Sequence, residues 1–109
     1  MKKFPLLLIF FISLIQSNDY LLVDVRTNDE WSAGHLSSAI HIPMQILLDK
    51  IPSAANNKYQ KIYLYCRSGT RAGKAKTMLE NIGYTNVENI GGLDDASTKL
   101  KETIIQDLL

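Results

Sequence analysis

The stretch that decides the fold is Ile62-Tyr63-Leu64-Tyr65-Cys66-Arg67-Ser68-Gly69-Thr70-Arg71, where an apolar run meets a polar loop. The apolar run predicts a short buried strand, and the loop holds the only cysteine of the chain. The segment 72–82 has helical spacing and is followed by Gly83, a typical C-terminal cap; its apolar residues are Ala72, Ala75, Met78, Leu79 and Ile82. Cys66 is therefore expected at a turn from strand to helix, where the unpaired N–H groups of the first helical turn hold an anion.

The surroundings of Cys66 favour a reactive thiol. Arg67 and Arg71 lie in the same loop. Positive charge and a helix N-terminus both stabilise the thiolate, which is the nucleophilic form of cysteine. The sequence thus predicts an ionised Cys66 that meets a negatively charged substrate. A buried, inert thiol is the alternative, and the polar flanking residues argue against it.

The rest of the chain alternates predicted strands and helices. We expect strands at 20–25, 39–42 and 87–90, and helices at 44–51, with Pro43 at its first position, and over most of 93–109. A short helical turn is expected to open at Asp29, with Asn28 or Asp29 as its N-cap, and to stop at Gly34. Residues 52–58 are expected to form an exposed connection, and Gly91-Gly92 a turn. This alternation predicts an α/β domain with a central, mainly parallel sheet covered by helices on both faces.

Composition limits the chain to one ordinary globular domain. It has 109 residues, of which 46% are hydrophobic and 21% charged, and its formal net charge is +1. No broad basic field points to nucleic acid, and we expect a monomer without a stable membrane partner.

The first seventeen residues have the features of a secretory signal peptide. Lys2 and Lys3 precede an apolar stretch at 4–15 that is shorter than a membrane-spanning helix needs, and a small residue, Ser17, ends the segment. We expect residues 1–17 to direct export to the periplasm, followed by the domain at 18–109. An uncleaved anchor is the alternative, because Ile15 is bulky where cleavage favours a small residue. In an exported protein, a lone cysteine indicates a free reactive thiol or an intermolecular bond.

Six motifs occur in a characteristic order: Asp24-Val25-Arg26, Glu30-Trp31, Gly34-His35, Ala39-Ile40-His41-Ile42-Pro43, the loop from Cys66 to Arg71, and Gly91-Gly92-Leu93. Over residues 20–100 this set resembles the single-domain rhodaneses, most closely their small exported thiosulfate sulfurtransferases. The resemblance implies a rhodanese-like fold and a ping-pong reaction. In it, Cys66 takes the outer sulfur of thiosulfate as a persulfide and releases sulfite. A thiophilic acceptor such as cyanide or a thiol then removes that sulfur, and no cofactor takes part.

The loop residues have expected roles in binding the substrate. Gly69 suits a tight loop whose amides turn inward. Arg71 is expected to face the substrate and also to brace the loop, whereas Arg67 is expected to face solvent and attract anions. The hydroxyls of Ser68 and Thr70 either bind substrate or cap the helix, and capping is expected for Thr70.

Other polar residues are expected to support the loops. The resemblance implies that Asp24 and Arg26 hold the loops, with Arg26 paired to Glu30, and a direct catalytic role is the alternative. His35 and His41 are expected to be hydrogen-bonded structural residues, and Trp31 to pack in the core. The spacing of the two histidines, without a second cysteine or a suitable carboxylate, argues against a metal site.

Two alternative functions fit parts of the pattern. A cysteine-dependent phosphatase or arsenate reductase also places a cysteine before an anion-binding loop and an arginine, but with that arginine one residue further along. A non-catalytic or sulfur-carrier rhodanese module is the second alternative, although such domains usually lose the cysteine that this chain retains.

Overall fold

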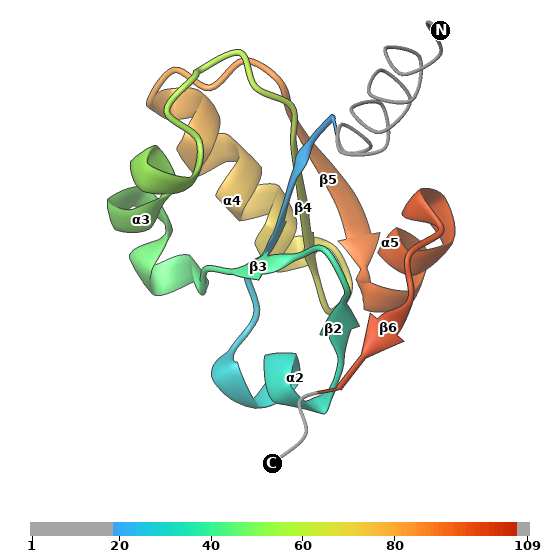
Figure 1. The fold of residues 1–109 in the computed structure, drawn as a ribbon. Coiled ribbons are helices and arrows are strands. Elements are labelled where there is room, and N and C mark those ends of the chain that lie inside the picture. Colours follow the sequence, from blue (N-terminus) through green and yellow to red (C-terminus); the bar gives the residue numbers. More distant parts are fainter. Residues whose placement is uncertain (1–18, 107–109) are drawn as a thin grey trace, which may run out of the picture.

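The computed structural model describes residues 19–106. Its centre is a parallel sheet with the strand order β3-β1-β4-β5 (Figure 1), which confirms the predicted α/β architecture. The four strands are β1 (Leu21–Asp24), β3 (Ile40–His41), β4 (Ile62–Cys66) and β5 (Val87–Gly92). A separate antiparallel pair joins β2 (His35–Leu36) to β6 (Ile104–Ile105).

Helices cover both faces of the parallel sheet, as the sequence predicts. Successive side chains of a strand point to opposite faces. Leu64 and Cys66 of β4 accordingly belong to one core cluster and Tyr65 to another. The helices α3 (Leu47–Ala54) and α4 (Thr70–Asn81) lie on the first side, and α5 (Leu93–Leu100) lies on the second (Figure 1).

The short helix α2 (Asn28–Ala33) begins one residue earlier than expected. Its N-cap is Thr27, not Asn28 or Asp29. Thr27 Oγ1 accepts a hydrogen bond from Glu30 N at 3.3 Å, and Glu30 Oε1 accepts one from Thr27 N at 3.1 Å. Only Thr27 has a glutamate three residues later, so only Thr27 completes this reciprocal capping box.

The helical segment after β3 is longer and less regular than expected. A 3₁₀ turn, η1 (Met44–Ile46), precedes α3, and Pro43 stands before that turn instead of inside a helix. The helix then continues through Pro52 to Ala54 because Ile51 and Ala55 are both packed in the core. The exposed connection predicted at 52–58 is therefore confined to its second half.

The C-terminal segment differs most from the expectation. Gly91 and Gly92 belong to β5 and do not form a separate turn. The helix predicted over most of 93–109 is present at Leu93–Leu100 and ends there, because Lys101 adopts a left-handed conformation with φ 55°; residues 107–109 lie outside the described residues. The β-branched residues of β6 then pair with β2, a partner that no local pattern indicates.

Within residues 19–106, no helix combines the length and the apolar character needed to cross a bilayer. The predicted signal peptide at 1–17 lies outside the described residues.

Candidate active site

Cys66 lies at the carboxyl end of β4, where the chain turns into α4. Its Sγ accepts hydrogen bonds from Gly69 N at 2.9 Å and from Ala72 N at 3.4 Å. Ala72 is the third residue of α4, so the sulfur takes the acceptor position that a capping side chain has at other helices. Cys66 is 1% exposed and belongs to the core cluster on the side of the sheet that α3 and α4 cover. A sulfur in this position is packed on one side and faces main-chain donors on the other.

Gly69 is the N-cap of α4 and makes the inward turn of the loop possible. Its φ is 99°, a region that glycine adopts without steric cost. Thr70 is the first helical residue and makes no capping hydrogen bond, so its predicted capping role is wrong. The reason is that Cys66 Sγ already bonds the Ala72 amide. The side chains of Arg67, Ser68 and Thr70 are exposed around this loop.

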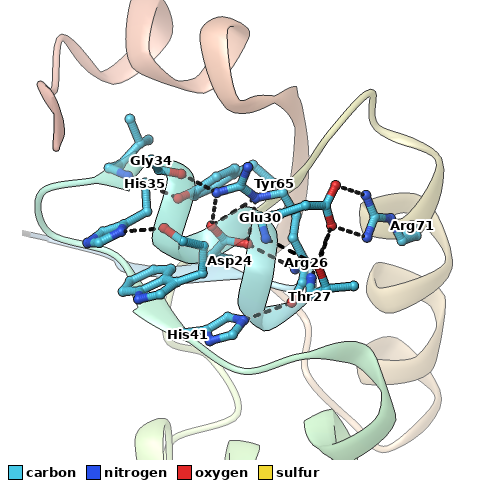
Figure 2. A network of polar contacts seen from close by, with 11 residues as sticks. Asp24, Arg26, Thr27, Glu30, Gly34, His35, His41, Tyr65 and Arg71 are labelled. Carbon is cyan, nitrogen blue, oxygen red and sulfur yellow. Dashed lines mark hydrogen bonds and ion pairs between the residues drawn. The ribbon is translucent and has the colours of Figure 1, made fainter. Parts of the chain in front are cut away.

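Arg71 braces the loop against α2. Its Nη1 and Nη2 donate to the two carboxylate oxygens of Glu30 at 2.8 and 2.9 Å. The hydrogen bonds from Arg71, with further bonds from Thr27 and against the effect of burial, lower the pKa of Glu30 to about 2. The same pairing raises the pKa of Arg71. The bracing role is thus visible in the contacts of Arg71, and Figure 2 shows the two side chains facing each other.

Asp24 and Arg26 form a buried ion pair at the end of β1 (Figure 2). Arg26 Nη2 donates to Asp24 Oδ2 at 2.7 Å and to the carbonyl of Gly34 at 2.6 Å. Burial opposes the positive charge, but the hydrogen bonds and charge of Asp24 raise the pKa of Arg26 above its ordinary value. The expected pairing of Arg26 with Glu30 is wrong, because Asp24 binds Arg26 and Glu30 binds Arg71 instead. The supporting role itself stays a prediction.

The two histidines lie on either side of Trp31. The Trp31 ring stacks on His35 with a centroid distance of 3.5 Å and on His41 with one of 4.9 Å. His35 Nδ1 lies 3.0 Å from the carbonyl of Trp31, and His41 Nε2 lies 2.7 Å from that of Arg26. These contacts agree with hydrogen-bonded structural histidines. Trp31 is half-buried between them and not enclosed in the core.

Sequence reasoning missed the residues of β5 that touch the cysteine loop. Asn89 Nδ2 donates to the carbonyl of Gly69 at 2.9 Å, and Asn89 Oδ1 accepts from Gly91 N at 2.9 Å. At Gly92, an added Cβ would lie only 2.2 Å from the carbonyl oxygen of Arg67. The available signal was an asparagine inside a predicted strand, two residues before Gly91-Gly92.

Known proteins are similar to this chain in sequence and in fold. Residues 11–98 match the model of the rhodanese-like domain. The thiosulfate sulfurtransferase PspE of Escherichia coli is 39% identical over 80 residues, which cover 72% of this chain and 77% of that protein. A tRNA uridine(34) hydroxylase of Erwinia tasmaniensis is 30% identical over 95 residues, or 83% of this chain, but these are only 27% of that protein.

Solved structures give the same result. A structure described as a rhodanese with anions from E. coli superposes with a TM-score of 0.73 and 32% identity, covering 81% of this chain and 99% of that one. A Helicobacter pylori protein, hp1203, is 34% identical with a TM-score of 0.66 and coverages of 83% and 81%. With its fold, its cysteine loop and these similarities, the chain belongs to the rhodanese-like domain family and is related to a thiosulfate sulfurtransferase.

Proposed function

We propose that this protein is a thiosulfate sulfurtransferase that carries sulfur on Cys66. The observation that supports this function is the pair of main-chain N–H groups of Gly69 and Ala72 directed at Cys66 Sγ. Hydrogen-bond donors at that position stabilise a negative sulfur, both as the thiolate and as the persulfide that follows. The relationship to PspE supports thiosulfate as the donor.

The reaction is two successive displacements at sulfur. The Cys66 thiolate attacks the outer sulfur of thiosulfate, a new S–S bond forms, and the old S–S bond breaks with its electron pair leaving on sulfite. The persulfide retains one negative charge. A nucleophile such as cyanide or a thiolate then attacks the terminal sulfur, and the electron pair returns to Cys66 as thiolate.

The other residues of the site have supporting parts in this proposal. Arg67 is exposed beside the loop and attracts the anionic substrate. Ser68 and Thr70 present hydroxyl groups at the loop surface, and the amides of Gly69 and Ala72 face the sulfur. Gly69 and Arg71 complete the substrate-binding loop in this proposal. Asp24 and Arg26 hold the neighbouring turn.

Export belongs to the same proposal. Residues 1–17 act as a signal peptide, and the domain at 18–109 works in the periplasm as a monomer. The mass of the protein isolated from a periplasmic fraction tests this, and a full-length chain there would indicate an uncleaved anchor.

Intact-protein mass spectrometry after incubation with thiosulfate tests the reaction. We expect a gain of one sulfur atom, loss of that gain on adding cyanide, and no gain in Cys66→Ser. Hydrolysis of an aryl phosphate is measured beside it. Phosphate release without sulfur transfer, or a sulfur gain that survives Cys66→Ser, would refute the proposal.

A further inference from the structure

The cysteine loop is hydrogen-bonded to β5 on the side that faces away from Cys66. Gly69 makes bonds in both directions: its N–H donates to Cys66 Sγ at 2.9 Å, and its carbonyl accepts from Asn89 Nδ2 at 2.9 Å. The same carbonyl accepts the first intrahelical bond of α4, from Gly73 N at 2.9 Å. The carbonyl of Gly69 is thus bound by Asn89 and by α4, while the N–H of the same residue faces the sulfur.

Asn89 is the last residue of β5 in regular register with β4, directly before a strand irregularity. Leu64 is opposite Asn89, but Cys66 is opposite Gly92, so β5 holds one residue more than β4 between these two pairs. Bulges of this kind redirect side chains and are common beside functional sites. The side chain of Asn89 is placed against the start of α4, where a Cβ on Gly73 would lie 3.4 Å from Asn89 Nδ2.

The orientation of the Asn89 amide is set by its own strand. Asn89 Oδ1 accepts from Gly91 N, so the NH₂ group is the half that faces Gly69. An aspartate here would keep the bond from Gly91 but would place an oxygen against the Gly69 carbonyl. A donor is required at this position because two acceptors repel each other.

We propose that Asn89 is a positioning residue for sulfur transfer: by holding the Gly69 carbonyl outward, it keeps the Gly69 N–H directed at Cys66. The role rests on the proposed function and adds to it a residue that contacts neither the sulfur nor the substrate. Without the tether, the Gly69 carbonyl keeps only the bond from Gly73 N, and the loop before it is held less firmly. A Gly69 N–H turned away from the negative sulfur disfavours the thiolate. The charged side chain of Arg71 interacts electrostatically with Cys66. Its ion pair with Glu30 does not involve Asn89.

The test compares Asn89→Asp and Asn89→Ala with the wild type. Both remove the donor, and only Asn89→Asp adds a charge. In both variants we expect the alkylation of Cys66 by iodoacetamide to need a higher pH for its half-maximal rate. We also expect persulfide formation at saturating thiosulfate to be about tenfold slower, the effect of weakening one charge-assisted hydrogen bond, with little change in KM.

Asn86→Ala and Asn86→Asp are the matched controls. Asn86 Nδ2 also lies near a carbonyl, that of Tyr59 at 3.4 Å, but at the opposite end of β5. These controls are expected to leave the alkylation profile unchanged. Thermal unfolding monitors the fold of every variant, and Asn89→Asp, which keeps the size of the side chain, remains testable if Asn89→Ala does not fold.

The outcomes separate the two proposals. A wild-type alkylation profile in folded Asn89 variants, or a shift in Asn89→Asp alone when both variants fold, would overturn the role of Asn89. Where only Asn89→Asp folds, its half-maximal pH of alkylation must shift further than that of Asn86→Asp. An equal shift in these two variants would also overturn the role of Asn89. Failure of the wild type to form a persulfide would refute sulfur transfer, and the alkylation test of Asn89 would still apply.

Discussion

Glu30 acts twice at the edge of the cysteine loop. Its carboxylate accepts from the backbone of Thr27 to complete the cap of α2, and it also binds both terminal nitrogens of Arg71. The positive charge of Arg71 is therefore balanced inside the protein. Arg67, which is exposed, remains the cation of the loop that faces solvent.

Glu30→Gln is predicted to destabilise the protein by about 1 kcal/mol at pH 7, because a partly exposed bidentate ion pair is weakened. The pKa of Glu30 is about 2 in the folded protein and near its ordinary value of 4.5 when unfolded. The stabilisation is therefore complete above pH 4.5 and is lost as the pH falls toward 2. Urea unfolding at several pH values measures this.

Glu80→Gln is the control for that series, since Glu80 forms an exposed pair with Lys76 one helical turn away. We expect its effect to stay below about 0.5 kcal/mol. A difference between wild type and Glu30→Gln that persisted unchanged at pH 2 would contradict the ion-pair explanation.

At the scale of elements, β5 and the cysteine loop touch through main chain. The carbonyl of Arg67 approaches Gly92 so closely that a Cβ would lie 2.2 Å from the oxygen and 3.0 Å from the carbonyl carbon. Neither atom belongs to a flexible side chain. The strand and the loop must therefore separate to admit any other residue, which explains glycine at this position.

Gly92→Ala is predicted to cost about 3 kcal/mol of stability and to abolish most of the sulfur gain from thiosulfate, because the loop is displaced from β5. Gly73→Ala, in the first turns of α4, is the matched control. Its added Cβ meets only Asn89 Nδ2, at an ordinary 3.4 Å, and alanine favours the helix. Thermal unfolding and intact mass after incubation with thiosulfate compare the two variants. Equal stability and an equal sulfur gain would show that the loop tolerates the displacement.

At the scale of the whole molecule, Glu102 joins parts distant in sequence. Its carboxylate accepts from Tyr20 Oη at 2.8 Å and from Ser38 N at 3.0 Å. Burial and the neighbouring Glu102 raise the pKa of Tyr20 to about 12. Burial of Glu102 acts against its charge, but the hydrogen bonds from Ser38 and Tyr20 lower its pKa overall. The carboxylate thus ties the chain after α5 to the start of β1 and to the turn before β3.

Glu102→Ala is predicted to lower stability by about 2 kcal/mol, since Tyr20 and Ser38 lose a charged partner. Persulfide formation on Cys66 is expected to be unaffected in the folded variant. The bonds of Glu102 lie before β1 and β3, whereas Cys66 lies at the other end of the parallel sheet, where β4 ends. A double-mutant cycle with Tyr20→Phe measures the shared bond. Strictly additive losses of stability would show that the two side chains do not interact.

Local patterns in the sequence were enough for the main elements of the fold. The apolar run before Cys66 and the helical spacing after it predicted the turn from strand to helix, since periods of 2 and 3.6 are properties of neighbouring residues. The start of α2 was misplaced because Thr27, Asn28 and Asp29 all suit an N-cap, and the end of α5 because no glycine or asparagine marks it in the sequence.

Long-range partners were decided only by the tertiary structure. Glu30 and Arg71 are 41 positions apart, and Gly69 and Asn89 are 20 apart. The short strand β6 was missed because its partner β2 lies far along the chain. The sequence by itself determined the α/β class and the cysteine at a helix start, because hydrophobic periodicity and turn chemistry are local. The packing of β5 and α2 around the loop decided which side chains brace the cysteine loop, because such contacts arise only when the sheet assembles.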